Sequence, residues 1–191
     1  ISVGIGLILG LVAGYVRVLD AVIMRTMDGL MSIPAILLAI ALISLSGATL
    51  GTVILAIVIP EVPRVVRLVR AVVLTVREEP YVEAAIAAGT RLPLILKRHI
   101  LPNTIAPLIV QATYVCASAM LTESILGFLG AGIPPEIPSW GNIMSEGRTY
   151  FQISPWIIFF PGIGLALTVL AVNIVGDGLR DTLDPRIARK I

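Results

Sequence analysis

Residues 29–60 read GLMSIPAILLAIALISLSGATLGTVILAIVIP, a run of 32 positions without a charged side chain. As a single helix this run would be about 48 Å long, which exceeds the roughly 30 Å hydrocarbon core of a bilayer. The cluster SGAT at 46–49, followed closely by Gly51, marks a turn inside the run. The sequence therefore predicts two membrane-crossing helices, over about 29–46 and 51–70, joined by a tight turn.

Three more uncharged runs occur along the chain, at residues 1–16, 100–122 and 149–176. Each is long enough to contribute most or all of one membrane crossing. We expect a span at 1–16, one over about 100–126, and a last one from Trp156 to Gly176. Together with the two spans above, the prediction is an all-α, polytopic membrane bundle with five spans.

The overall composition agrees with a membrane protein. Apolar residues make up 57% of the 191 positions and charged residues 14%, with a mean hydropathy of +0.99. Soluble domains carry about a quarter charged residues, and disordered chains carry few apolar ones, so both classes are excluded. A single cysteine (Cys116) and a single histidine (His99) allow no internal disulfide and no Cys- or His-rich metal site. The net charge of +2 is too small to indicate nucleic-acid binding.

The basic residues predict the orientation of the chain. If the five spans alternate, thirteen of the fourteen Lys and Arg residues fall on one side, and only Arg148 falls on the other. The positive-inside rule then places residues 71–99 and the C-terminus in the cytoplasm and residues 127–155 outside. The chain would start outside, and it begins with Ile rather than Met. We therefore expect a six-span subunit whose N-terminal span is missing from this sequence.

Arg64, Arg67 and Arg70 stand at every third position of the third predicted span. This spacing is typical of a voltage-sensing helix. The favoured interpretation is a positive-inside anchor whose arginines reach the interface, because there are only three of them and no selectivity-filter sequence is present. Pro60 and Pro63 are expected to break the helix just before them.

The cytoplasmic segment 78–91 has the local signals of a short helix. Acidic residues precede Pro80, which suits a first helical position, and Gly89 suits the C-terminal cap. Its four alanines leave a thin profile that lets another surface come close. A solvated connecting helix is the alternative.

Here the sequence resembles a known family. Glu83-Ala84-Ala85 with Gly89, followed by Ile100-Leu101-Pro102, is similar to the EAA motif of binding-protein-dependent ABC importer permeases. Five ordered segments resemble the C-type permease of dipeptide, oligopeptide and nickel importers: YVEAA at 81–85, RHILPN at 98–103, PSWGN at 138–142, SEGR at 145–148 and GDGLRD at 176–181. His99 stands where the general EAA pattern has an apolar residue, a departure that is common in the peptide branch.

The resemblance implies a fold, a function and partners. The fold is the type I transmembrane domain of ABC importers. The function is that of a permease subunit for di- or oligopeptides, with nickel or glutathione as alternative substrates. The implied partners are a homologous second permease, two ABC ATPase subunits, an extracytoplasmic substrate-binding protein and membrane lipid. The implied location is the plasma or inner membrane of a bacterium or archaeon, with a cytoplasmic C-terminus.

The same resemblance assigns ATPase coupling to Glu83, Ala84, Ala85 and Gly89. The chain has no Gly-x-x-x-x-Gly-Lys-Ser/Thr loop, so we expect a non-catalytic subunit without cofactor or metal, with ATP and Mg²⁺ bound by the ATPases. A proton-coupled secondary carrier, which needs no ATPase, is a remote alternative.

Charged and polar side chains inside spans are candidates for the translocation path. Glu61 and Glu123 are the main candidates, although Glu61 has a simpler interpretation as the partner of Arg64 one turn away. Three weaker candidates are Gln111, Ser118 and Asn173.

Two segments outside the spans complete the prediction. Seven of the fifteen residues 127–141 are Gly or Pro, so the external segment 127–155 should hold an ordered loop. Aromatic residues around it predict an interfacial belt: Trp140, Tyr150, Phe151 and Trp156. By resemblance this face meets the substrate-binding protein, and a plain connector is the alternative. The tail 177–191, with seven charges in fifteen positions, is expected to be a cytoplasmic segment that touches the ATPase.

Overall fold

The computed structural model describes residues 1–183, which form helices and short connections without a strand. Two compact units can be distinguished. Among the described residues, unit 1 contains Ile1–Ser32, Glu61–Ala112 and residues 176–183, and unit 2 contains Ile33–Pro60 and Thr113–Val175. The part of the predicted tail beyond residue 183 lies outside the described residues, and residues 177–183 belong to the last helix.

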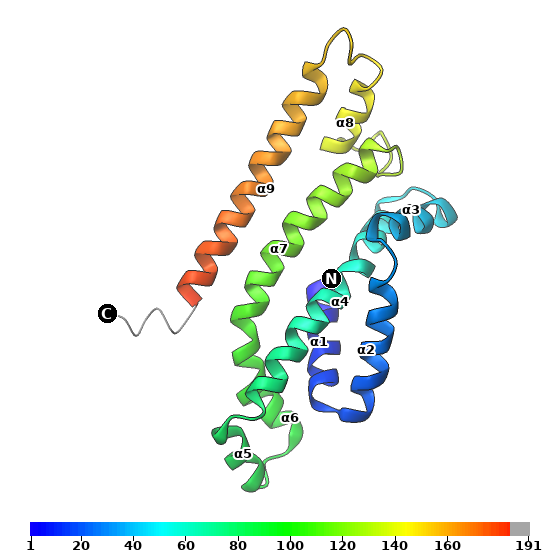
Figure 1. Ribbon diagram of the computed structural model, residues 1–191. Helices are drawn as coiled ribbons and strands as arrows, with labels where there is room; N and C mark the ends of the chain where they lie inside the picture. The colour runs from blue at the N-terminus through cyan, green and yellow to red at the C-terminus, as the bar shows by residue number, and fades with distance from the viewer. Residues whose placement is uncertain (184–191) are drawn as a thin grey trace. The chain divides into compact units, whose positions relative to one another are not determined.

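Unit 1 is built from short helices and from parts of three long ones (Figure 1). Its elements are α1 (Ser2–Tyr15), α2 (Arg17–Met31), the second part of α4 (Leu50–Val76), α5 (Pro80–Ala87), α6 (Leu92–Ile95), the π-helix η1 (Leu96–Ile100), the first part of α7 (Leu101–Phe128) and the end of α9 (Trp156–Leu183).

Three glycines on one face of α1 bring this helix against α4. Each glycine faces a buried valine of α4, and the pairs are Gly6–Val65, Gly10–Val69 and Gly14–Val73. A Cβ atom placed on Gly10 or Gly14 would lie 2.6 Å from the valine Cβ, so only glycine fits at this separation. Small residues four apart are a common device for close packing of membrane helices.

Ion pairs join α2 to α4 within the same unit. Arg70 donates to both carboxylate oxygens of Asp20, at 2.5 and 2.6 Å, and Arg67 donates to Asp28 at 2.6 Å. Arg67 and Arg70 of the third predicted span are thus tied to carboxylates of α2, a long-range pairing that the sequence did not predict.

The structure contradicts two expectations about proline. α4 continues without a break from Leu50 to Val76, so Pro60 and Pro63 do not interrupt it. Proline's fixed φ lies in the helical range, and each proline removes only one N–H donor, a loss that packed membrane helices tolerate.

The predicted span 29–46 is not one helix. α2 ends at Met31 and α3 (Ala35–Ser46) begins after Pro34, whose ψ of 126° is not helical. Proline pushes the residue before it, Ile33, away from helical geometry, so the helix stops before this pair.

Unit 2 contains α3, the first part of α4, the rest of α7, α8 (Trp140–Gly147) and most of α9. The predicted turn at 46–49 is present, and Thr52 closes it by donating to the Gly47 carbonyl at 2.6 Å. Buried apolar residues from α3, α4, the end of α7 and the loop after it form the core of the unit: Ala39, Ile43, Val53, Ala56, Leu126 and Ile133.

Two stretches of the described chain are long and apolar enough to cross a membrane, Leu92–Phe128 and Trp156–Leu183. A third is obtained if Arg17–Met31 and Ala35–Ser46 are counted as one interrupted span. The predicted number of five is not reached by these criteria. α1 has only 14 residues, about 21 Å of helix. α4 has 27 residues, and its second half carries one Glu and three Arg residues.

Candidate functional site

The predicted short helix of segment 78–91 is present as α5, and its two ends show why it forms. Glu79 is the N-cap residue and Pro80 is the first helical residue. At the other end Gly89 has a φ of +77°, which residues with a Cβ rarely adopt. The Gly89 N–H donates to the Ile86 carbonyl at 2.9 Å, and the Thr90 N–H donates to the Ala85 carbonyl at 3.1 Å. This pair of bonds is a Schellman C-cap, which ends the helix at a fixed place.

One face of α5 is buried and the other is open. Val82 is fully buried, whereas Glu83 and Ala84 are exposed and Ala85 is half-buried. Ile86 is also 48% exposed, which leaves an apolar side chain on the open face. Of the four predicted coupling residues, three are therefore accessible on α5 and its cap, and Ala85 is partly so. Such a face, small in profile and bearing one acid and one large apolar group, suits a protein partner.

The second EAA-like segment lies against α5. The Asn103 side-chain amide donates to the Tyr81 hydroxyl at 3.2 Å and to the His99 carbonyl at 2.6 Å. The rings of Tyr81 and His99 have centroids 5.9 Å apart. His99, the residue that departs from the general EAA pattern, therefore takes part in a contact between α5 and the start of α7. The sequence alone does not predict that these two segments touch.

A π-helix, η1, leads from α6 into α7. Its last N–H bond runs from Leu101 to the Leu96 carbonyl, five residues back. Pro102 follows at once and has no N–H to donate to the Arg98 carbonyl, so a standard helical turn cannot be completed here. Wider turns of this kind are frequently found at functional sites. Pro102 is the sequence signal from which the irregularity could have been predicted.

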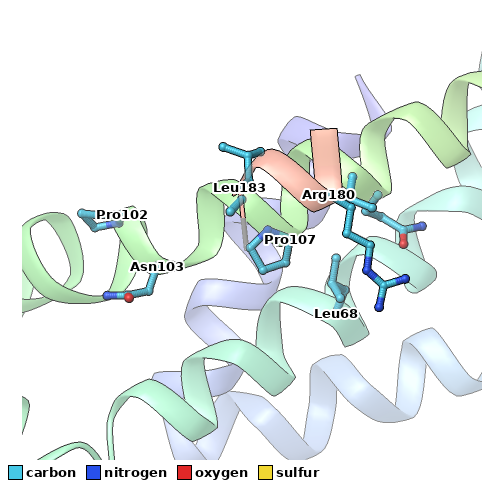
Figure 2. A pocket seen from close by; sticks show the side chains of 9 residues that line it. Leu68, Pro102, Asn103, Pro107, Arg180 and Leu183 are labelled. Carbon is cyan, nitrogen blue, oxygen red and sulfur yellow. The ribbon is translucent and has the colours of Figure 1, made fainter. Parts of the chain in front are cut away.

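A cavity of about 610 Å³ lies in unit 1, beside the first turns of α7 (Figure 2). Its wall is mostly apolar, with one guanidinium and two carboxamides among its groups. The lining residues are Leu68, Pro102, Asn103, Ala106, Pro107, Val110, Gln111, Arg180 and Leu183. Gln111 is thus a predicted path residue that lines a cavity. Asn103 belongs both to this wall and to the contact with α5.

Glu61 is 5% exposed and accepts a hydrogen bond from Arg64 at 2.9 Å. The predicted pairing of these two residues is confirmed. Glu61 is not among the residues that line the cavity.

The other three path candidates lie in unit 2. The Oε1 atom of Glu123 is buried, and no hydrogen-bond partner for it is found among residues 1–183. Its other oxygen accepts a long bond, 3.5 Å, from the Ser124 hydroxyl. Ser118 is half-buried on α7, and Asn173 is exposed on α9. Neither unit by itself brings the five candidates together.

The loop between α7 and α8 is ordered by the PSWGN segment. Ser139 caps α8 by accepting the Asn142 N–H at 3.2 Å. The Asn142 side chain donates to the carbonyls of Ile133, Pro134 and Ile137 at 3.0–3.2 Å. This asparagine fastens the Gly- and Pro-rich loop to the first turn of α8, so the predicted ordered loop is present.

Two other members of the segment pack closely. A Cβ atom on Gly141 would lie 2.7 Å from the Ser124 carbonyl oxygen, so α8 starts directly against α7. A Cβ on Gly164 of α9 would lie 2.9 Å from the Trp140 ring. The four residues of the predicted aromatic belt are all exposed: Trp140, Tyr150, Phe151 and Trp156.

Residues 3–189 match a family described as the binding-protein-dependent transport system inner membrane component. The chain belongs to this family. The predicted family resemblance is thereby confirmed. A probable peptide ABC transporter permease of Sinorhizobium fredii is 60% identical over 178 residues, which are 93% of this chain and 61% of that relative.

Two other relatives carry more specific names. The dipeptide transport system permease of Alkalihalophilus pseudofirmus is 45% identical, over 95% of this chain and 60% of its own length. The glutathione transport system permease of Pectobacterium atrosepticum is 39% identical, over 96% of this chain and 61% of its own length. The chain therefore spans about three-fifths of the length of these relatives.

Among solved structures, an inward-facing MetNI methionine ABC transporter has a chain with the same fold. The TM-score is 0.72, at 20% identity, and the match covers 96% of this chain and 86% of that chain. The all-α membrane fold that the sequence predicted is confirmed by this likeness and by the helices of the described residues.

Proposed function

We propose that this chain is the transmembrane core of a permease subunit in an ATP-driven importer of di- or oligopeptides. The observation that carries the proposal is α5: a rigidly capped helix with Glu83, Ala84 and Ile86 exposed, fixed to the start of α7 through Tyr81. The names of the relatives supply the peptide substrate. The glutathione permease among them supports a second candidate, an importer of glutathione, which is itself a small peptide.

In the proposed mechanism α5 docks on an ABC ATPase subunit. Glu83 offers a carboxylate for charge-assisted hydrogen bonds, and the alanines let the partner surface come close. When the ATPases close on ATP they move α5. Because Val82 is buried and Tyr81 contacts both His99 and Asn103, this movement is passed to η1 and α7.

The remaining assignments follow from the same proposal. This subunit is non-catalytic, and ATP and Mg²⁺ bind to the ATPases. A homologous permease completes the path, to which we assign Gln111 together with Glu61, Ser118, Glu123 and Asn173. Within residues 1–183 no group of three or more His, Cys, Asp or Glu side chains that fits a metal ion is found. The external segment 127–155 meets the substrate-binding protein, and the cytoplasmic tail 177–191 touches the ATPase.

Replacement of Gly89 tests the coupling role. The full-length subunit is co-expressed with its partner permease and ATPases, and the membranes are solubilised. Gly89→Asp should leave the permease in the membrane but abolish co-purification of the ATPases and ATP-dependent uptake, because φ is +77° there and the cap would be lost.

Gly47→Asp is the matched control. Gly47 also has a positive φ, +83°, and open space around it, but it lies in the turn after α3. This variant should assemble and transport. Normal uptake by Gly89→Asp would refute the assignment of α5 as the coupling helix.

The substrate is tested with the wild-type complex in proteoliposomes. ATP-dependent uptake of a dipeptide, and not of Ni²⁺, supports the proposal, and preferential uptake of glutathione selects the second candidate. Uptake driven by a proton gradient without ATP would point to a secondary carrier instead.

A further inference from the structure

The cavity of unit 1 has the size and composition of a small-molecule site. Its volume of about 610 Å³ falls within the roughly 300–1,000 Å³ that is usual for ligand pockets. Such pockets combine an apolar wall with a few polar groups that fix the orientation of the ligand. Here Leu68 of α4, Pro107 of α7 and Leu183 of α9 lie around the same space as Arg180 (Figure 2).

Arg180 provides a binding group for an anion. Within residues 1–183 its guanidinium takes part in none of the ion pairs, which join other arginines to Glu61, Asp28 and Asp20. The planar fork of an arginine matches a carboxylate, which accepts two parallel N–H bonds. Arg180 is exposed, and the apolar wall beside it offers van der Waals contact to the rest of a bound ligand.

Acceptor groups lie on the other part of the wall. The Asn103 side-chain N–H groups already serve the Tyr81 hydroxyl and the His99 carbonyl, which leaves the amide oxygen of Asn103 as an acceptor. Pro107, four residues later, has no N–H to give to the Asn103 main-chain carbonyl. The cavity therefore offers donors at Arg180 and acceptors at Asn103.

This pattern is complementary to a short peptide. A peptide has a C-terminal carboxylate for Arg180 and N–H donors for the acceptors at Asn103. Its side chains vary, and an apolar wall without further charges accepts many of them. We propose that the cavity binds a short peptide in transit, with the peptide's C-terminal carboxylate on Arg180. This inference rests on the proposed function, because it takes a peptide to be the transported substrate.

Asn103 connects the cavity to α5. The same residue lines the cavity and donates a hydrogen bond to Tyr81 of α5. A peptide in the cavity thus contacts a residue that is hydrogen-bonded to α5. Binding of peptide in the cavity and the position of α5 are therefore linked.

The test uses the full-length transporter complex without its substrate-binding protein, so that the receptor's own selectivity does not enter. The probes are the dipeptide alanyl-phenylalanine and its C-terminal amide, which lacks the negative charge, and binding is measured by calorimetry. The wild-type complex should bind the acid about ten-fold more tightly than the amide, as expected for one charge-assisted contact. Arg180→Gln should remove this difference, and Arg180→Lys should keep most of it.

Arg25→Gln is the matched control, because Arg25 is an exposed arginine of the same unit that does not line the cavity. It should keep the wild-type preference. An equal acid-to-amide ratio in the wild type and in Arg180→Gln overturns the inference. A second result also overturns it: Arg180→Gln loses a co-purified anionic phospholipid, as seen by mass spectrometry, while its peptide binding is unchanged. The proposed function fails separately, if the wild-type complex with its receptor shows no ATP-dependent peptide uptake.

Discussion

At the scale of single residues, the glycines of α1 decide how closely two helices approach. Gly10 faces the Cβ of Val69, and the space left for a Cβ on Gly10 is 2.6 Å, far below an ordinary contact. Gly4, on the same helix, has nothing within 4 Å of its Cβ position. The sequence shows the spacing of the glycines, but not which of them face another helix. That distinction comes from tertiary packing and not from residue type.

We therefore predict opposite effects for two alanine substitutions in α1. Gly10→Ala should destabilise the purified transporter by about 1–3 kcal/mol, because the added methyl group forces α1 away from α4. Gly4→Ala should be neutral or slightly stabilising, since alanine favours helix more than glycine does. Thermal unfolding of the complex measures both effects. Equal melting temperatures for the two variants would show that α1 and α4 do not pack as described.

At the scale of elements, the prolines have opposite effects on the helices that contain or follow them. Uncharged runs predicted the positions of α7 and α9 to within a few residues, except that α9 continues to Leu183. Pro34 stands at the start of a helix and separates α2 from α3, whereas Pro60 lies within α4 without ending it. The same residue type gives both results, because the packing around each helix decides whether a lost N–H bond is tolerated. The ion pairs of α4 with Asp20 and Asp28 were hidden for a similar reason: their partners are 39 or more positions apart.

The contact between α5 and α7 leads to a prediction about coupling. Tyr81→Phe removes the hydroxyl that accepts the Asn103 N–H but keeps the ring beside His99. One neutral hydrogen bond contributes about 0.5–1.5 kcal/mol, so the ATPases should still assemble. The number of peptides imported per ATP hydrolysed should fall several-fold, because α5 is held less firmly to α7.

The measurement is uptake and ATP hydrolysis in the same proteoliposomes, with Tyr150→Phe as the control, since Tyr150 is exposed in the connection after α8. If Tyr81→Phe keeps the wild-type ratio of uptake to hydrolysis, the Asn103 bond does not transmit the movement of α5.

At the scale of the whole molecule, the distribution of charge predicts how the chain lies in the membrane. Because the chain belongs to a family of inner-membrane proteins, this prediction can be tested in bacterial cells. The positive-inside rule places α5 in the cytoplasm and the segment after α8 outside. Arg148, the exception to the basic side, donates to the Ser145 hydroxyl at 2.9 Å and lies 5.1 Å from the Phe128 ring centroid. These local partners give Arg148 a structural role, so it does not argue against the predicted orientation.

Two engineered cysteines test this orientation. Cys116, the single native cysteine, is replaced by serine, and a cysteine is placed at Glu83 or at Tyr150, which are both exposed. A membrane-impermeant maleimide should label Tyr150→Cys in spheroplasts and should label Glu83→Cys only after the membrane is opened. Co-expression with the ATPases should then protect position 83 in opened membranes but leave position 150 reactive, because docking covers α5 and not the external segment. Labelling of Glu83→Cys from outside would contradict the predicted orientation. It would also contradict the assignment of α5 to an ATPase.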